Sequence, residues 1–250
     1  MENSIVLIHG LFGNLSAPEI IDAFGDADVS TPDLVGFGQY RATSTVGLSL
    51  QDQAEHVITH INQHHEAPVH LVGHSVGGAV AALIVSSRPD LVASLISVEG
   101  NFTLKDAFWS EQIARKSEAE VASIIEGYRC DPDTWMNGAI NKPSVLSSRL
   151  AREWLANQPA STIKHQAQAT IAATAGDEYL KSLRRIMETE MPVHLIAGSR
   201  SSSGWDTPAW ANELCTSRTN IPDCGHLMMV EAPTRFATAI LASIYLGNSL

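Results

Sequence analysis

Residues 69–78 read VHLVGHSVGG and decide how the chain is organised. The apolar residues at 69–72 are typical of a buried strand, and the small apolar run at 79–85 is typical of a buried helix. Between them stands Gly-x-Ser-x-Gly, whose glycines leave room for a sharp turn with Ser75 at its tip. The pattern predicts a strand, a turn and a helix, and it makes Ser75 a candidate nucleophile. The alternative is a serine at an ordinary glycine-rich turn.

The rest of the chain repeats short apolar runs that are separated by helical patterns. Apolar runs at residues 4–8, 69–72, 95–98 and 193–197 predict buried strands, and residues 28–31 and 218–221 predict a weak strand and a short strand. Continuous apolar runs are typical of parallel strands that are buried on both faces. Helical periodicity lies between them, for example at Leu50, Ala54, Val57 and Ile61. The sequence therefore predicts an α/β fold with a mostly parallel sheet of about six strands flanked by helices.

Composition excludes several classes of partner. The net charge of −11 argues against nucleic acid and against an anionic membrane surface. The longest apolar runs are shorter than the roughly 20 residues that a membrane span needs. The residues after Met1 lack the pattern of a secretory leader, so a cytoplasmic location is expected.

One predicted helix carries histidines at a spacing that could suit a metal. His56, His60 and His64 recur every four residues, and two such imidazoles can share a ligand. A solvated polar stripe is the preferred interpretation. The three cysteines also form no metal-binding pattern. We expect neither a metal nor another cofactor.

Two further loops complete a pattern with the Ser75 turn. His9 and Gly10 follow the first apolar run, and Gly225 and His226 lie near the end of the chain, ahead of a Glu-x-Pro sequence. Together these motifs resemble the α/β-hydrolase superfamily, and the resemblance covers essentially the whole chain. It implies the α/β-hydrolase fold, without the hairpin that usually precedes the first buried strand.

The resemblance also implies roles for individual residues. His226 matches the catalytic base, which takes the proton of Ser75. The backbone N–H groups of Leu11 and Val76 match the two donors that stabilise the developing oxyanion. The segment 102–191, which shows only helical patterns, matches the family's cap in position, so the core is expected at 1–101 and 192–250.

The cap and the loops near Ser75 are expected to form an apolar pocket for the substrate. Aromatic side chains are frequent in this segment and are typical of such pockets. The candidate substrate-binding residues are Phe12, His74, Phe102, Trp109 and Leu227.

The third catalytic residue departs from the commonest family pattern. That pattern has an aspartate three residues after the glycine that ends the penultimate strand, and here the position holds Ser201. Glu99 closes an apolar strand, where a buried charge is costly without a partner. Haloalkane dehalogenases of one type and zearalenone lactonases look similar, with a glutamate after this strand. Glu99 is therefore the predicted acid, and Asp206 is the alternative.

These residues predict a serine hydrolase that cleaves a small-to-medium carboxylic ester, lactone or related acyl bond through an acyl-enzyme. The expected partner is a small apolar acyl substrate, and the oligomeric state stays open. A cofactor-free dioxygenase or an acyltransferase on the same fold is one alternative. A receptor that only holds a small ligand under the cap is another.

Overall fold

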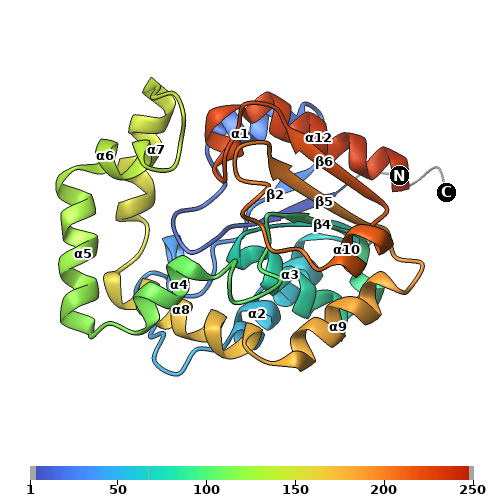
Figure 1. Ribbon diagram of the computed structural model, residues 1–250, viewed down its shortest axis with the longest axis horizontal. Coiled ribbons are helices and arrows are strands. Elements are labelled where there is room, and N and C mark those ends of the chain that lie inside the picture. The colour runs from blue at the N-terminus through green and yellow to red at the C-terminus, as the bar shows by residue number, and fades with distance from the viewer. Residues whose placement is uncertain (1–3, 67, 248–250) are drawn as a thin grey trace.

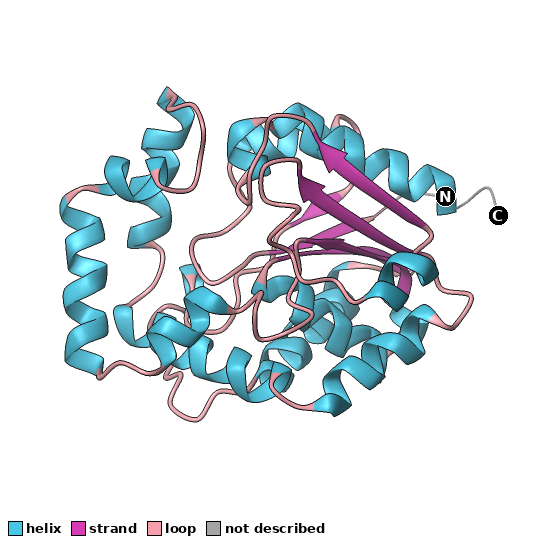
Figure 2. Cartoon of the chain, in the orientation of Figure 1, coloured by secondary structure: helices cyan, strands magenta, loops and turns pink. Residues whose placement is uncertain are grey.

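A computed structural model describes residues 4–66 and 68–247 of the chain, and within them six strands form one sheet. The spatial order is β2-β1-β3-β4-β5-β6, and all neighbouring strands are parallel (Figures 1 and 2). The strands are β1 (Ile5–Ile8), β2 (Val29–Ser30), β3 (Val69–His74), β4 (Val92–Val98), β5 (Val193–Gly198) and β6 (Ser217–Ile221). The predicted fold class and parallel sheet are confirmed.

Burial along the strands explains why continuous apolar runs form the centre of the sheet. Every residue of β1, β3 and β5 is buried, because helices cover both faces there. The edge strand β6 alternates between partly exposed and exposed positions, and only Ile221 is buried. The other edge, β2, has only two residues, as expected from its weak sequence pattern.

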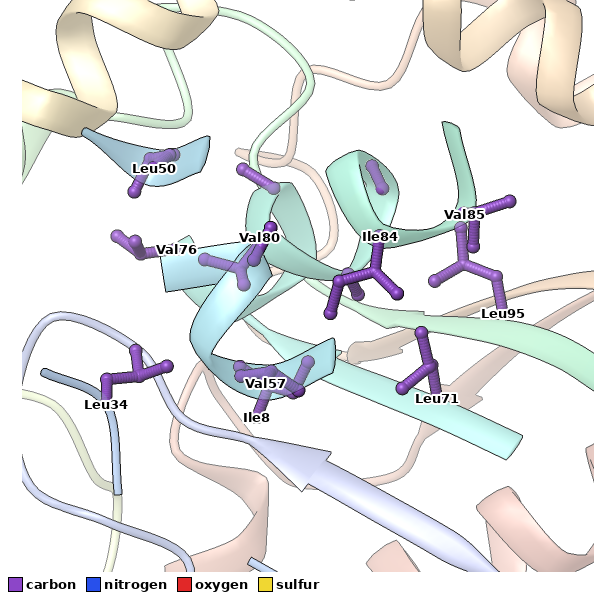
Figure 3. Packing of buried hydrophobic residues seen from close by; sticks show 14 of the residues in the cluster. Ile8, Leu34, Leu50, Val57, Leu71, Val76, Val80, Ile84, Val85 and Leu95 are labelled. Carbon is purple, nitrogen blue, oxygen red and sulfur yellow. The ribbon is translucent and has the colours of Figure 1, made fainter. Parts of the chain in front are cut away.

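Helices cover the two faces of the sheet and define two apolar cores. Helices α1 (Pro18–Ile21) and α12 (Pro233–Gly247) lie on one face, and α2 (Leu50–His64) and α3 (Val76–Ser87) lie on the other (Figure 1). Figure 3 shows the core on the α2 and α3 face of the sheet. Val57 from α2, Val80 from α3 and Leu71 of β3 belong to this buried cluster. The small side chains of α3 are buried almost all round, so this helix can pack closely against the strands.

The segment between β4 and β5 contains helices and, within the described residues, no strand. Helices α5 (Glu118–Cys130), α6 (Pro132–Asn137) and α7 (Val145–Ala156) project beyond the carboxyl edge of the sheet, at the left of Figure 1. Helix α4 (Phe108–Ala114) connects them to the core. Helices α8 (Ala160–Thr174) and α9 (Asp177–Met187) return along α2 and α3, and α10 (Ala209–Leu214) follows β5. The extent of the cap stays a prediction, and residues 1–3 and 248–250 of the predicted core lie outside the described residues.

The helical pattern at 163–188 does not form one continuous helix. The chain breaks between α8 and α9. Gly176 is extended there, with φ −96° and ψ 149°, and Asp177 and Glu178 begin the new helix. Glycine destabilises a helix interior, and acidic residues stabilise a helix start, so both favour the break. No helix in the described residues is long and apolar enough to cross a membrane.

A buried histidine fixes the loop after β1. His9 is only 2 % exposed, and its Nδ1 lies 2.9 Å from the carbonyl oxygen of Gly10. The backbone N–H of Leu34 donates to Nε2 over 3.4 Å, which requires that nitrogen to be unprotonated. Burial lowers the pKa of His9 to about 4, against weaker opposing effects of the Gly10 hydrogen bond and Asp33. The folded chain therefore holds this imidazole neutral.

The first prediction concerns the close contact between α3 and β1. A Cβ atom on Gly77 would lie 2.2 Å from the carbonyl oxygen of Ile8, whereas one on Gly127 of α5 would meet no atom within 4 Å. Gly77→Ala should therefore lower the free energy of unfolding by roughly 1–3 kcal/mol, because the backbones must separate. Gly127→Ala, the matched control, should raise it by up to about 1 kcal/mol. Urea unfolding measures both, and equal effects would contradict the packing described.

The second prediction concerns pH. Because the pKa of His9 is lower in the folded chain than the usual 6.5, the unfolded chain binds the proton first as pH falls. The stabilisation is complete above about pH 6.5 and is lost as pH falls towards 4. Between pH 7 and 4, the free energy of unfolding of the native chain should fall further than that of His9→Asn, by up to roughly 3 kcal/mol. Urea unfolding across that range tests this, and parallel pH curves for the two proteins would refute it.

Candidate active site

Ser75 stands in a strained turn between β3 and α3. Its backbone has φ 54° and ψ −121°, a region that residues with a side chain rarely adopt. Its N–H donates to the carbonyl oxygen of Val98 over 3.1 Å, which ties the turn to the end of β4. A Cβ on Gly73 would lie 2.4 Å from the carbonyl oxygen of Gly77, so only glycine allows the chain to fold back this closely. The turn holds the serine at the carboxyl edge of the sheet, where α/β folds place their ligands.

The two predicted oxyanion donors lie beside this turn. Val76 is the first residue of α3, a position whose N–H has no partner within the helix. Leu11 follows Gly10, and a Cβ on Gly10 would lie 3.1 Å from the Cβ of Ser75. Both residues line the same cavity as Ser75. Their role as donors to an oxyanion stays a prediction.

Glu99 and His226 form a hydrogen-bonded pair at the same edge. Nδ1 of His226 lies 2.7 Å from Oε2 of Glu99, although 127 residues separate them in the sequence. The other carboxylate oxygen, Oε1, accepts hydrogen bonds from the N–H of Gly198 at 2.8 Å and from Oγ of Ser201 at 2.5 Å. Glu99 is only 6 % exposed and adopts φ 41°, directly after β4. Both oxygens of this buried charge therefore accept hydrogen bonds.

The surroundings keep Glu99 ionised. Burial is the largest single influence and disfavours the charge, but the hydrogen bonds from His226, Ser201 and Gly198 and the attraction of His226 outweigh it. The pKa of Glu99 is consequently lower than its ordinary value. A carboxylate in this state can orient the imidazole and offset a positive charge on it.

Ser201 is a contact of Glu99 that the sequence pattern did not reveal. The position three residues after Gly198 was noted because it lacks a carboxylate. In the structure its hydroxyl donates to Glu99, so this position supports the acid. The sequence carries no signal for this contact, because a serine hydroxyl does not show which carboxylate it will meet.

Asp206, the alternative acid, is engaged elsewhere. Its Oδ2 accepts a hydrogen bond from Oγ of Thr103 at 2.7 Å, and its Oδ1 lies 3.4 Å from Nζ of Lys105. Its backbone N–H donates to Asp106 at 2.7 Å. These contacts join the loop after β5 to the start of the helical segment, and they leave Glu99 as the carboxylate in contact with His226.

His74 packs against the ring of His226 and binds its backbone. The two rings lie 4.5 Å apart between centroids, and Nε2 of His74 donates to the backbone oxygen of His226 over 3.0 Å. Burial, and then the proximity of His226, lower the pKa of His74 well below its usual value, so the ring is neutral. Gly198 lets the loop that carries His226 approach β5, because a Cβ at position 198 would lie 2.4 Å from the carbonyl oxygen of Gly225.

A cavity of about 720 Å³ lies over these residues and under the projecting helices. Its lining includes Ser75, Glu99 and His226, and also four of the five predicted substrate-binding residues, namely Phe12, His74, Trp109 and Leu227. The remaining lining is largely apolar. Aromatic residues that sequence reasoning did not assign to the pocket, Tyr128, Trp135, Trp154 and Trp205, supply much of it.

Phe102 is a correction to the predicted pocket. It is only 3 % exposed and lies outside the cavity lining, with its ring packed 5.8 Å from that of Trp205 and 6.3 Å from that of Trp210. The residue belongs to the core because the loop after β4 turns it inward, a turn that Asp106 holds by accepting the N–H groups of residues 102 and 103. Sequence alone does not show the direction of a loop side chain.

The histidine stripe of α2 is only partly solvated. His60 stacks on His64 with centroids 4.3 Å apart, and Nε2 of His56 lies 3.1 Å from the backbone oxygen of Asp33. Burial and the neighbouring histidines lower the pKa of His60 to about 4. Among the residues that the structure describes, no group of three or more histidine, cysteine, aspartate or glutamate side chains is placed to hold a metal ion.

Known proteins show the same architecture. The epoxide hydrolase CorEH matches 97% of this chain and 91% of its own with a TM-score of 0.74 and 20% identity. Cfl2 from Burkholderia cenocepacia matches 96% and 87% with a TM-score of 0.75 and 16% identity. At these identities the likeness shows the fold alone.

Sequence comparison identifies the family. An (E)-2-((N-methylformamido)methylene)succinate hydrolase from Acinetobacter baylyi is 27% identical over 157 residues, which are 61% of this chain and 57% of that protein. The chain thus matches little more than half the length of this curated relative. A model of the alpha/beta hydrolase family matches residues 5–239, almost the entire chain. The chain belongs to the alpha/beta hydrolase family.

Proposed function

We propose that this chain is a serine hydrolase that cleaves a small-to-medium carboxylic ester, lactone or related acyl bond through an acyl-enzyme. Ser75 is the nucleophile, His226 the general base and Glu99 the orienting acid. The observation that carries the proposal is the 2.7 Å contact between His226 and the buried Glu99, in the cavity that Ser75 also lines. Family membership supports the coarser statement, an enzyme of the hydrolase class.

The proposed reaction begins with the transfer of a proton. A serine hydroxyl is a weak nucleophile at neutral pH, so His226 accepts its proton while Oγ of Ser75 attacks the acyl carbon. Glu99 binds Nδ1 of the ring, which leaves Nε2 to exchange the proton, and its negative charge stabilises the imidazolium. His226 then protonates the leaving group, and a water molecule repeats the sequence to release the acid.

Negative charge develops on the carbonyl oxygen during each attack. The backbone N–H groups of Leu11 and Val76 are the proposed donors to this oxygen, and each such donor typically contributes about 3 kcal/mol. Both groups belong to turns that glycines hold in place, so they need not reorganise as the charge appears. Fixed donors of this kind stabilise the transition state more than water does.

The lining of the cavity supports a small apolar substrate. Phe12 packs against Trp135 with centroids 5.4 Å apart, and the chain of rings continues through Tyr128 to Trp109.

Serine rather than a carboxylate at the turn favours acyl transfer over the attack on carbon–halogen bonds or epoxides. The net charge disfavours nucleic acid as a partner, and a cytoplasmic location stays a prediction from the sequence. A dioxygenase, an acyltransferase or a receptor on this fold are the alternatives.

The third prediction tests the reaction class. A fluorophosphonate should label the native protein, because the probe needs an activated serine beside oxyanion donors. Ser75→Ala should abolish both labelling and the hydrolysis of p-nitrophenyl esters. Ser202→Ala, on the loop after β5, is the control and should retain both. Labelling that survives in Ser75→Ala, or an unlabelled native protein, would remove the serine hydrolase from consideration.

The fourth prediction assigns the acid. Replacing an orienting carboxylate by its amide typically lowers kcat by about 10⁴-fold. Glu99→Gln should therefore lose on the order of 10³-fold or more in kcat, because the ring of His226 loses its negative partner. Asp206→Asn should stay within roughly 10-fold of the native value, since Asp206 contacts Thr103 and Lys105. Steady-state kinetics on variants with unchanged thermal unfolding decide, and the reverse ranking would move the acid to Asp206.

A further inference from the structure

We propose that Glu231 is a positioning residue that fixes the backbone N–H of Gly225, the residue before His226, and links it to the loop between α6 and α7. The inference rests on the proposed function, since His226 is its target. Glu231 ends the short helix α11 (Met228–Glu231), and its side chain is only 7 % exposed. A carboxylate buried to this degree requires donors around it.

The carboxylate of Glu231 contacts three separate segments. The backbone N–H of Gly225, the residue before His226, donates to Oε1 over 2.7 Å. The guanidinium of Arg200, after β5, donates to both oxygens at 2.7 and 2.5 Å. The backbone N–H of Asn141 donates to Oε2 over 2.9 Å. One side chain therefore joins three loops: the histidine loop (residues 222–227, between β6 and α11), the loop after β5 and the α6–α7 loop.

Other groups hold the polar backbone atoms around the Gly225 N–H. Arg200 donates through its backbone N–H to the carbonyl oxygen of Cys224 at 2.9 Å, and Ser199 accepts from the N–H of Asp223 at 3.0 Å. His74 holds the carbonyl oxygen of His226. Glu231 accepts the N–H of Gly225, and Arg200 holds the other side of the same peptide through the carbonyl oxygen of Cys224. Because a misplacement of about 1 Å can reduce a rate 10²-fold, this contact bears on the reaction of His226.

The contact with Asn141 extends the effect to the substrate cavity. Gly138 and Ala139, a few residues before Asn141, line the same cavity as Ser75. Glu231 therefore couples one wall of the cavity to the loop that carries the proposed base. A residue that acted only on stability would change neither KM nor kcat of the folded protein.

The chemistry of the site requires a carboxylate and excludes an amide. All the groups that face Glu231 are N–H donors, and a carboxylate accepts at both oxygens. In Glu231→Gln the new NH₂ group must point at one of those donors, whichever way the amide is turned. The side chain keeps its size, so the variant removes the electrostatic contact without creating a cavity.

The experiment compares Glu231→Gln with Glu188→Gln, a matched control whose partner Arg184 lies on α9. Glu231→Gln should lower kcat for a p-nitrophenyl ester by roughly 10- to 100-fold with a smaller rise in KM, and Glu188→Gln should leave both unchanged. Arg200→Gln keeps the Gly225 contact and should lose less than Glu231→Gln. A native kcat in folded Glu231→Gln, or an equal loss in Glu188→Gln, would overturn the proposal.

A second readout is independent of any substrate. A histidine proton shared with a carboxylate gives a far-downfield proton resonance, which His226→Ala should remove from the spectrum and so assign. In Glu231→Gln this resonance should shift or broaden while the remaining spectrum stays native. An unchanged resonance would overturn the proposal. A native protein that shows the resonance but takes no fluorophosphonate would instead count against the proposed function and leave the positioning role intact.

The α6–α7 contact has its own pair of variants. Asn141→Pro removes the N–H that Glu231 accepts, whereas Asn141→Ala keeps it. Asn141→Pro should raise KM at least a few-fold while kcat falls less than in Glu231→Gln, and Asn141→Ala should match the native protein. Identical kinetics for the two Asn141 variants would refute the coupling between this loop and the cavity.

Discussion

The close approach of backbones around Ser75 is the constraint on which this structure depends. A Cβ on Gly78 would lie 2.5 Å from the Cα of Gly100, and one on Gly77 would lie 2.2 Å from the carbonyl oxygen of Ile8. The start of α3 therefore touches the ends of β1 and β4 with no side chain between them. This contact sets the depth at which Ser75 sits and the distance to the loops after both strands. The strain of its backbone persists because the strands on either side over-determine the turn.

The burial of Glu99 places a second demand on the fold. A charge with so little exposure is stable only where donors surround it, and those donors come from three places: the end of β5, the loop after it, and the histidine loop. The same carboxylate thereby draws together segments that are about 100 and 127 residues away in the sequence. Stability and chemistry share one set of hydrogen bonds at this point.

Several carboxylates organise the site, and each one contacts different segments of the chain. Glu99 holds the ring of His226, and Glu231 accepts the N–H of the residue before it. Asp106 and Asp206 tie the entry of the helical segment to the loop after β5. The parallel sheet brings all these loops to one edge, so short side chains are enough to join them. The cavity wall formed by α5 and α6 is then attached to the core at both ends.

The sequence by itself determined the parallel sheet and the turn at Ser75, because buried strands and glycine-rich turns are local patterns. It also indicated Glu99, because a charge that closes an apolar strand needs a partner wherever the chain folds. Only the tertiary structure decided which partners meet that charge, and Ser201 is the example, since a hydroxyl carries no sequence signal of the carboxylate it contacts. The direction of Phe102 and the break at Gly176 were likewise open, because loop side chains and helix ends follow from packing between distant segments. Local chemistry fixed the elements, and the long-range contacts of buried polar groups fixed the site.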